Sequence, residues 1–163
     1  IKYTMFPAEL LPLTGLYGAL ISQGVGLMLL VIFGVVRNHS ISLDLLWIVP
    51  CLFLEIAFLA GVAWLLAAIG AVLRDIKEVI PITLATGMFF TPIFYDSSTL
   101  PALIRTIVEL NPLSVLLMCF RAAMIGLPMN LPQLAWFSVF SIALCPLGFV
   151  AFERVRGEIA DTL

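Results

Sequence analysis

The chain has 163 residues, of which 63% are hydrophobic and 11% are charged, and its formal net charge is −2. Its mean hydropathy of +1.18 excludes a soluble domain, because a core of this length has no room for so much apolar surface. The charge balance excludes a basic nucleic-acid-binding arm and leaves other partners open.

Four apolar segments are long enough to cross a bilayer, which takes about 20 residues of helix. They cover residues 13–36, 45–73, 79–95 and 134–152. The third is the shortest and contains two prolines and a glycine, so we expect it to be kinked or locally unwound. The predicted fold class is an all-α polytopic membrane protein with four transmembrane helices.

The distribution of lysine and arginine predicts the orientation of these spans, because cytoplasmic loops carry the excess of positive charge. Both ends of the chain are predicted to be cytoplasmic. The cytoplasmic side holds Lys2, Arg74, Lys77, Arg154 and Arg156, and the opposite side holds Arg37, Arg105 and Arg121.

Small residues recur at spacings of three and four in the first two spans. Such stripes let helices approach closely in lipid. Packing inside one subunit and contact between subunits both fit this pattern. The stripes are Gly15, Gly18, Ser22 and Gly26 in the first span, and Ala60, Ala63, Ala67 and Ala71 in the second.

Residues 96–132 do not read as one helix. A first short helix is expected over residues 101–110. Asn111 suits the N-cap of a second one, with Pro112 at its first position, and Gly126 marks its end. Two short apolar helices of this kind predict an outward-facing re-entrant hairpin with its turn at Asn111 and Pro112. An ordinary loop lying on the membrane surface is the alternative.

Two charged residues stand out against the apolar background. Glu55 is the one acid deep inside a span, where it is either a functional group or a hydrogen-bonded structural one. Arg121 lies in the second short helix and is expected to snorkel to water, to pair, or to bind an anion. Arg105 and Glu109 are four residues apart and suit an ion pair on the first short helix.

The sequence predicts neither a catalytic residue nor a metal site on this chain. It contains no G-x-x-x-x-G-K-[ST] phosphate loop and no G-x-S-x-G elbow, and His39 is its one histidine. Cys51, Cys119 and Cys145 are far apart in apolar segments, which favours buried small hydrophobic side chains.

Four patches, taken in order, resemble the membrane-spanning subunit of an ABC-2 type ATP-binding-cassette exporter. The similarity is greatest to the polysaccharide-export permeases, which handle O-antigen, capsule or teichoic acid. The patches are Lys2 with Phe6-Pro7-Ala8-Glu9-Leu10-Leu11-Pro12; Arg74-Asp75-Ile76; Thr91-Pro92-Ile93-Phe94-Tyr95 with Leu100-Pro101; and Leu110-Asn111-Pro112-Leu113 with Arg121.

The resemblance implies a six-span subunit of which residues 1–163, a single transmembrane domain, hold the last four spans. The first residue, Ile1, fits a chain whose N-terminus is missing. The resemblance also implies a homodimer in the bacterial inner membrane, bound to a separate cytoplasmic ATPase that uses ATP and Mg. No cofactor is expected on this chain. The implied function is ATP-driven export of a lipid-linked polysaccharide.

The resemblance also suggests where the functional residues lie. Aromatic faces suit sugar rings, although aromatic residues are equally expected as an interfacial belt. The cytoplasmic segment 1–12 is a candidate ATPase contact, with a plain interfacial anchor as the alternative. The candidate path residues are Phe89, Phe90, Phe94, Tyr95, Arg121 and Glu55, with Arg121 a candidate contact to the carrier-lipid phosphate; the candidate ATPase contacts are Lys2, Phe6, Pro7 and Glu9.

Three other functions stay open on the sequence. The cargo of an ABC-2 exporter can instead be a drug, an antibiotic or another lipid. A membrane-embedded enzyme acting on a polyprenyl carrier is a second alternative, and a structural scaffold without transport is a third.

Overall fold

Helices form every regular element in the part of the chain that the structure describes, which comprises residues 8–38, 43–73, 75–93, 95 and 99–160. The structure is a computed structural model. The elements in chain order are the 3-10 helix η1 (Ala8–Leu13), α1 (Thr14–Asn38), the 3-10 helix η2 (Leu43–Trp47), α2 (Ile48–Val72), α3 (Ile76–Phe89), α4 (Ala102–Leu110), α5 (Pro112–Ile125) and α6 (Leu131–Ala160).

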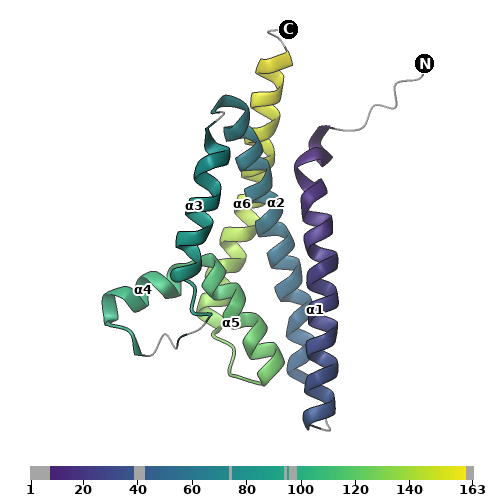
Figure 1. Cartoon of the computed structure of the whole chain (residues 1–163), viewed down its shortest axis with the longest axis vertical. Helices are drawn as coiled ribbons and strands as arrows, with labels where there is room; N and C mark the ends of the chain where they lie inside the picture. The colour runs from purple at the N-terminus through teal and green to yellow at the C-terminus, as the bar shows by residue number, and fades with distance from the viewer. Residues whose placement is uncertain (1–7, 39–42, 74, 94, 96–98, 161–163) are drawn as a thin grey trace, which may run out of the picture.

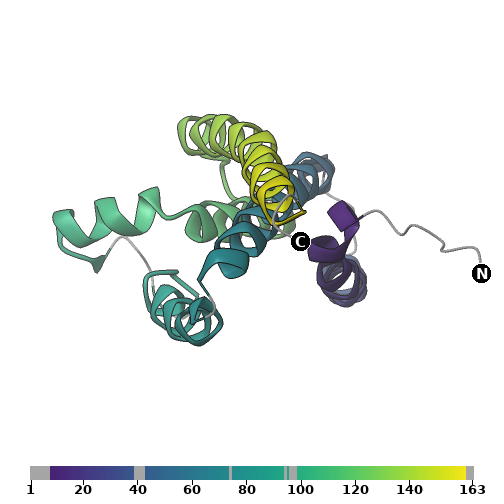
Figure 2. The same ribbon diagram turned by 90° about the horizontal axis from the view of Figure 1, so that it is seen from above.

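Three long helices, α1, α2 and α6, run along the length of the molecule (Figure 1). η1 and the last turns of α6 lie at one end of the molecule, here called the η1 end. The connection η2 lies at the opposite end, here called the η2 end. α3 starts at the η1 end and covers part of this length, whereas α5 continues toward the η2 end. Seen from above, α4 projects sideways from the other helices (Figure 2).

Three helical segments of the described chain are long and apolar enough to cross a membrane: Glu9–Val36, Leu43–Val72 and Leu131–Gly157. They confirm the first, second and fourth predicted spans. The bent pair α4–α5 is a further candidate, either as one broken span or as a re-entrant loop. The protein is therefore an all-α polytopic membrane protein.

The third predicted span, residues 79–95, differs from the structure at both ends. α3 begins at Ile76 and ends at Phe89, which gives 14 residues. At the helical rise this is about 21 Å, less than the apolar core of about 30 Å. The expected local unwinding lies directly after Phe89, where Thr91 and Pro92 are not helical.

α2 and α6 cross at two glycines, and this is the most extensive helix contact of the chain. A Cβ atom added to Gly61 would lie 2.8 Å from the carbonyl carbon and oxygen of Leu144, and one added to Gly148 would collide with the Gly61 carbonyl group. Only glycine permits two backbones to come this close.

The core joins α2, α5 and α6. Phe137 is fully buried and packs against Phe58, with 5.7 Å between the ring centroids. Cys51 and Cys119 are buried in the same cluster, as the sequence predicted, and Cys145 is half-buried. The core cluster comprises Cys51, Leu54, Phe58, Val115, Leu116, Cys119, Leu134 and Phe137.

The two small-residue stripes have different surroundings. Of the stripe on α2, Ala60 is buried, Ala63 and Ala67 are half-buried, and Ala71 is exposed. In α1, a Cβ atom added at Gly15, Gly18 or Gly26 would meet nothing within 4 Å. The stripe in the second span therefore packs partly within this chain, whereas the glycines of the stripe on α1 have no partner among the described residues.

Candidate functional site

Asn111 forms the turn between α4 and α5 and ties it to the end of α3. Its side-chain oxygen accepts a hydrogen bond from the backbone N–H of Leu113 at 3.1 Å, and Pro112 occupies the first turn of α5. The predicted N-cap is therefore confirmed. The side-chain nitrogen donates to the hydroxyl of Thr91 and to the carbonyl oxygen of Phe90, both at 3.3 Å. We call Phe90, Thr91, Asn111 and Ser114 the α3–α5 junction.

The junction adds side-chain hydrogen bonds to backbone carbonyl groups at the end of α3. Ser114 donates through its hydroxyl to the Phe90 carbonyl at 3.2 Å, so this oxygen receives two side-chain donors. Thr91 is 6% exposed and donates to the carbonyl of Gly87 at 3.0 Å. Unwound backbone persists at membrane depth only where protein or water satisfies its polar groups. The side chains of Asn111 and Ser114 are such partners for the carbonyl oxygen of Phe90.

α4 and α5 meet at an angle of 81°. The two short helices and the turn at Asn111 are as predicted, and the bend between the helices fits either a re-entrant hairpin or one broken span. Gly126 ends α5 with a φ of 72°, a left-handed conformation that favours glycine. On α4, Arg105 and Glu109 form the predicted ion pair, with 2.7 Å between Nε and Oε1.

Arg121 reaches back from α5 to the chain that follows α3. Its guanidinium donates to the carbonyl oxygen of Ile93 at 2.7 Å. Three roles were expected for Arg121: snorkelling to water, pairing, or binding an anion. The structure shows pairing, with a backbone carbonyl group as the partner. A guanidinium has five N–H donors, so this bond leaves capacity for an anion.

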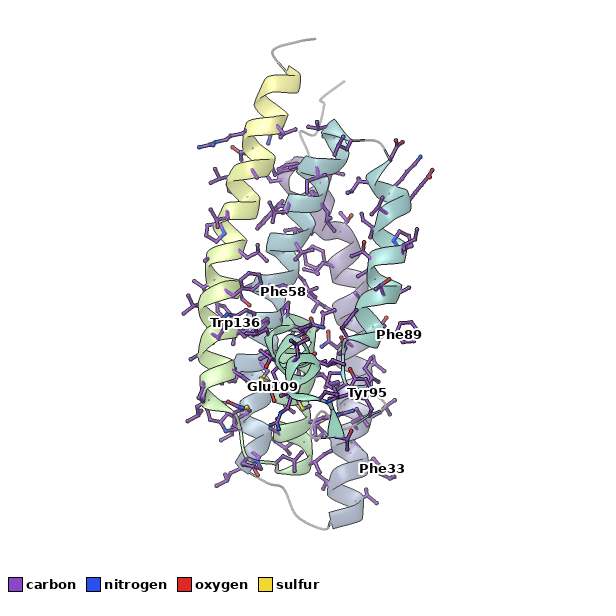
Figure 3. All side chains as sticks on the ribbon, turned by 90° about the vertical axis from the view of Figure 1, so that its left-hand side faces the viewer. Phe33, Phe58, Phe89, Tyr95, Glu109 and Trp136 are labelled. Atoms are coloured by element: carbon purple, nitrogen blue, oxygen red, sulfur yellow. The ribbon has the colours of Figure 1, made fainter. Side chains whose placement is uncertain are left out.

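The described path aromatics lie at the end of α3 and in the chain that follows it. Phe89 is 76% exposed and projects away from the bundle (Figure 3). Phe90 is partly exposed, and the hydroxyl of Tyr95 donates to the Phe89 carbonyl at 3.0 Å. Phe94 lies outside the described residues. Among the described aromatics, no ring contact joins Phe89, Phe90 and Tyr95.

A cavity of about 230 Å³ lies between the junction, α4 and the start of α6. Arg105, Glu109, Asn130 and Gln133 contribute polar groups to its wall, and Pro92 contributes an apolar one. The cavity therefore combines charge, amide groups and apolar surface beside the break between α3 and α5.

Glu55 is bound to a residue of α1. The side-chain nitrogen of Gln23 donates to its Oε2 at 2.6 Å, and both side chains are part-buried. This contact is consistent with the expectation that Glu55 is a hydrogen-bonded structural group. The sequence did not predict that Gln23 is the partner of Glu55. A glutamine inside the apolar run of α1 was the available signal, because a polar side chain at that depth needs a partner.

The predicted ATPase contact falls partly in η1. Lys2, Phe6 and Pro7 lie outside the described residues. Glu9 forms an ion pair with Arg156 of α6, and its backbone carbonyl accepts a hydrogen bond from Nε1 of Trp64 at 3.0 Å. η1 is thereby tied to both α2 and α6 at the η1 end.

These features define a class of protein: a multi-pass membrane protein in which the end of one short helix is hydrogen-bonded to the side-chain-capped start of another. The family model described as "ABC-2 type transporter" matches residues 13–125, most of the chain. The chain therefore belongs to the ABC-2 type transporter family.

Curated relatives of the chain are O-antigen export system permease proteins named RfbA. Two are from Klebsiella pneumoniae, 23% and 21% identical over 164 residues, and each comparison covers all of this chain and 63% of the relative. One from Myxococcus xanthus is 25% identical over 162 residues, with 97% of this chain and 62% of the relative covered. The chain thus spans less than two thirds of the length of these relatives.

Proposed function

We propose that the protein is the membrane-spanning permease of an ATP-driven exporter that moves a lipid-linked polysaccharide across the bacterial cytoplasmic membrane. The observation that carries the proposal is the α3–α5 junction in a member of the ABC-2 family. Its satisfied, unwound backbone is the kind of element that occurs beside conduction paths. The names of the curated relatives support a glycan as the cargo.

The proposal assigns the chemistry of ATP to a partner. Two copies of the permease pair around the path, and a cytoplasmic ATPase subunit binds ATP and Mg and drives the pair between two arrangements. The η1 end faces this ATPase. Lys77, Arg154 and Arg156 belong to elements that meet at this end, which supports the orientation by the positive-inside rule.

Within the path, we assign the glycan to the outer side of the junction. Phe89, Phe90 and Tyr95 offer apolar faces for sugar rings, and Arg121 offers a charge-assisted contact for a phosphate of the carrier lipid. The cavity beside Pro92, Arg105 and Asn130 adds polar groups on the same side.

Deletion of the gene tests the proposal. We expect glycan to disappear from the cell surface while lipid-linked glycan accumulates inside the cell, because synthesis continues without export. The wild-type gene should restore the surface glycan. The Asn111→Ala variant, present in the membrane at equal abundance, should fail to restore it. Both results together support export through this permease. An unchanged surface glycan overturns the cargo and favours an exporter of a drug, an antibiotic or another lipid. Loss of the lipid-linked glycan itself favours an enzyme.

A further inference from the structure

Two cysteines on different helices are in direct contact, and the proposed function makes no use of them. Cys51 lies in the first turn of α2 and Cys119 in the middle of α5, and these residues are 1% and 4% exposed. Both thiols are free, and they are hydrogen-bonded to each other. A disulfide forms only between cysteines whose side chains meet. The pair is therefore placed for a covalent bond between α2 and α5.

The two thiols differ in their access to water. Cys119 lines the cavity beside α4, whereas Cys51 is not part of its wall. The cavity of about 230 Å³ is much larger than the roughly 15 Å³ that one water molecule requires, and charged and amide groups contribute to its lining. A small polar solute can therefore reach Cys119 from the cavity, with Cys51 behind it as a second thiol.

The position of the pair along the molecule favours oxidation. α2 starts at the η2 end and α5 runs toward that end, so Cys51 and Cys119 lie in the half of the molecule nearer to it (Figure 1). In the orientation proposed above, this half faces the outside of the cytoplasmic membrane. Disulfides form and persist in the oxidising bacterial periplasm.

We propose that Cys51 and Cys119 are a modification site at which a hydroperoxide forms a disulfide between α2 and α5. The Cys119 sulfur attacks one oxygen of the hydroperoxide and the O–O bond breaks. The other oxygen leaves with the thiol proton, as water or an alcohol, and Cys119 becomes a sulfenic acid. The Cys51 sulfur then attacks the Cys119 sulfur, the S–O bond breaks as the S–S bond forms, and the hydroxyl leaves with the Cys51 proton as water. Two thiols are thus oxidised by two electrons while one hydroperoxide is reduced.

The disulfide would act on the α3–α5 junction. Asn111 and Ser114 of α5 hold the end of α3 through the Phe90 carbonyl, and Cys119 lies further along the same helix. Oxidation therefore fixes the junction to α2, and reduction releases it, whichever cargo the exporter carries.

Cys145 provides an internal comparison. It is half-buried on α6, and its backbone nitrogen lies 2.9 Å from a Cβ atom added to Gly61. Gly61 is about 15 Å further along α2 than Cys51 at the helical rise. Cys145 is therefore out of reach of Cys51 and Cys119, so its oxidation cannot form a disulfide within the chain.

The test uses the full protein in nanodiscs, first reduced and then titrated with hydrogen peroxide without any ATPase. Denaturation, alkylation with a maleimide and peptide mapping report the state of each cysteine. We expect Cys51 and Cys119 to lose their reactivity together, because one disulfide consumes both, and their peptides to be joined. Dithiothreitol should restore both thiols, whereas Cys145 should occur in no disulfide within the chain.

Two variants resolve the order of the steps. Cys51→Ala removes the second thiol, so dimedone should trap the sulfenic acid of Cys119 about ten-fold more than in wild type. Cys119→Ala removes the thiol at the cavity wall, and oxidation of Cys51 should become about ten-fold slower, because its own access is poor.

The wild-type protein decides the outcome even where a variant fails to fold. Sulfinic acid at Cys119 in place of the disulfide overturns the proposal, and so do Cys51 and Cys119 thiols that stay reduced throughout the titration. Because oxidation is measured on the isolated protein, a failure of the export assay leaves this result unaffected.

Discussion

Asn111 and Thr91 are hydrogen-bonded at 3.3 Å, although 20 positions separate them in the sequence. One side chain thus caps the start of α5 and holds the end of α3, so two breaks in the helical pattern stabilise each other. The break at the end of the third predicted span and the break at Asn111 are therefore joined in one hydrogen-bonded structure.

Replacement of Asn111 tests this double role. Asn111→Ala removes the cap and both bonds to α3, and we expect a loss of about 1–2 kcal/mol in the free energy of unfolding, the usual effect of removing a cap. Asn111→Asp keeps an acceptor for Leu113 but loses the donor to Thr91. Thermal unfolding in detergent should therefore rank wild type above Asp and Asp above Ala. Equal stability of the Asp and Ala variants would show that the cap contributes nothing.

The pair of Gln23 and Glu55 should show strong coupling. Gln23→Leu leaves the Glu55 carboxyl group without its donor, which is expected to destabilise the protein by about 1–3 kcal/mol. The double variant Gln23→Leu/Glu55→Leu removes both polar groups and should recover most of this loss. Denaturation of the four proteins of the cycle measures the coupling, and additive effects would contradict the hydrogen bond.

The crossing of α2 and α6 should tolerate no side chain at Gly148. Gly148→Leu forces the helices apart, because even a Cβ atom collides with the Gly61 backbone. We expect little folded protein, measured as the monodisperse fraction in size-exclusion chromatography. Gly24→Ala is the matched control, since a Cβ atom there meets nothing within 4 Å. It should leave that fraction unchanged or raise it, because alanine favours helix by about 1 kcal/mol over glycine.

Cysteine crosslinking tests both the proposed orientation and the ATPase contact. Leu11 in η1 is 59% exposed, and a cysteine there should capture the ATPase subunit. Leu43 at the η2 end is 83% exposed, and a cysteine there should not. Capture from Leu43 instead of Leu11 would reverse the orientation. Capture from neither, together with failure at neighbouring positions in residues 1–12, would remove η1 from the contact.

Substitution of Arg121 distinguishes its hydrogen bond to the Ile93 carbonyl from its proposed contact with phosphate. Arg121→Gln keeps a donor for the Ile93 carbonyl but loses the positive charge, so folding should be retained while glycan export falls, by about ten-fold if one charge-assisted bond to phosphate is lost. Arg121→Lys keeps the charge and should retain more export. Equal export by wild type and Arg121→Gln would assign the arginine to the bond with Ile93 alone.

The sequence predicted features that depend on neighbouring residues. The apolar runs indicated three of the membrane helices, and the order of Asn111 and Pro112 predicted where α5 begins. Contacts between distant segments were missed, because a local pattern does not say which polar side chain meets which. Gln23 and Glu55, Trp64 and Glu9, and Ser114 and Phe90 belong to this group.

The glycines show the same limit. The stripe on α1 had the spacing expected for close helix contact, yet nothing in the described chain packs there. Gly61 and Gly148, which do make the closest approach, were not among the residues predicted for close helix contact. Spacing identifies faces on which helices can meet, whereas the three-dimensional arrangement decides which face is used.

The length of α6 has a mechanical consequence. Its 30 residues extend about 45 Å, some 15 Å more than the apolar core of a bilayer. The last turns of α6 carry Glu153, Arg154 and Arg156 at the η1 end, where we expect them to lie outside the apolar core. Pro146 lies inside α6 two residues before Gly148, so we expect any bending of this long helix to occur at its crossing with α2.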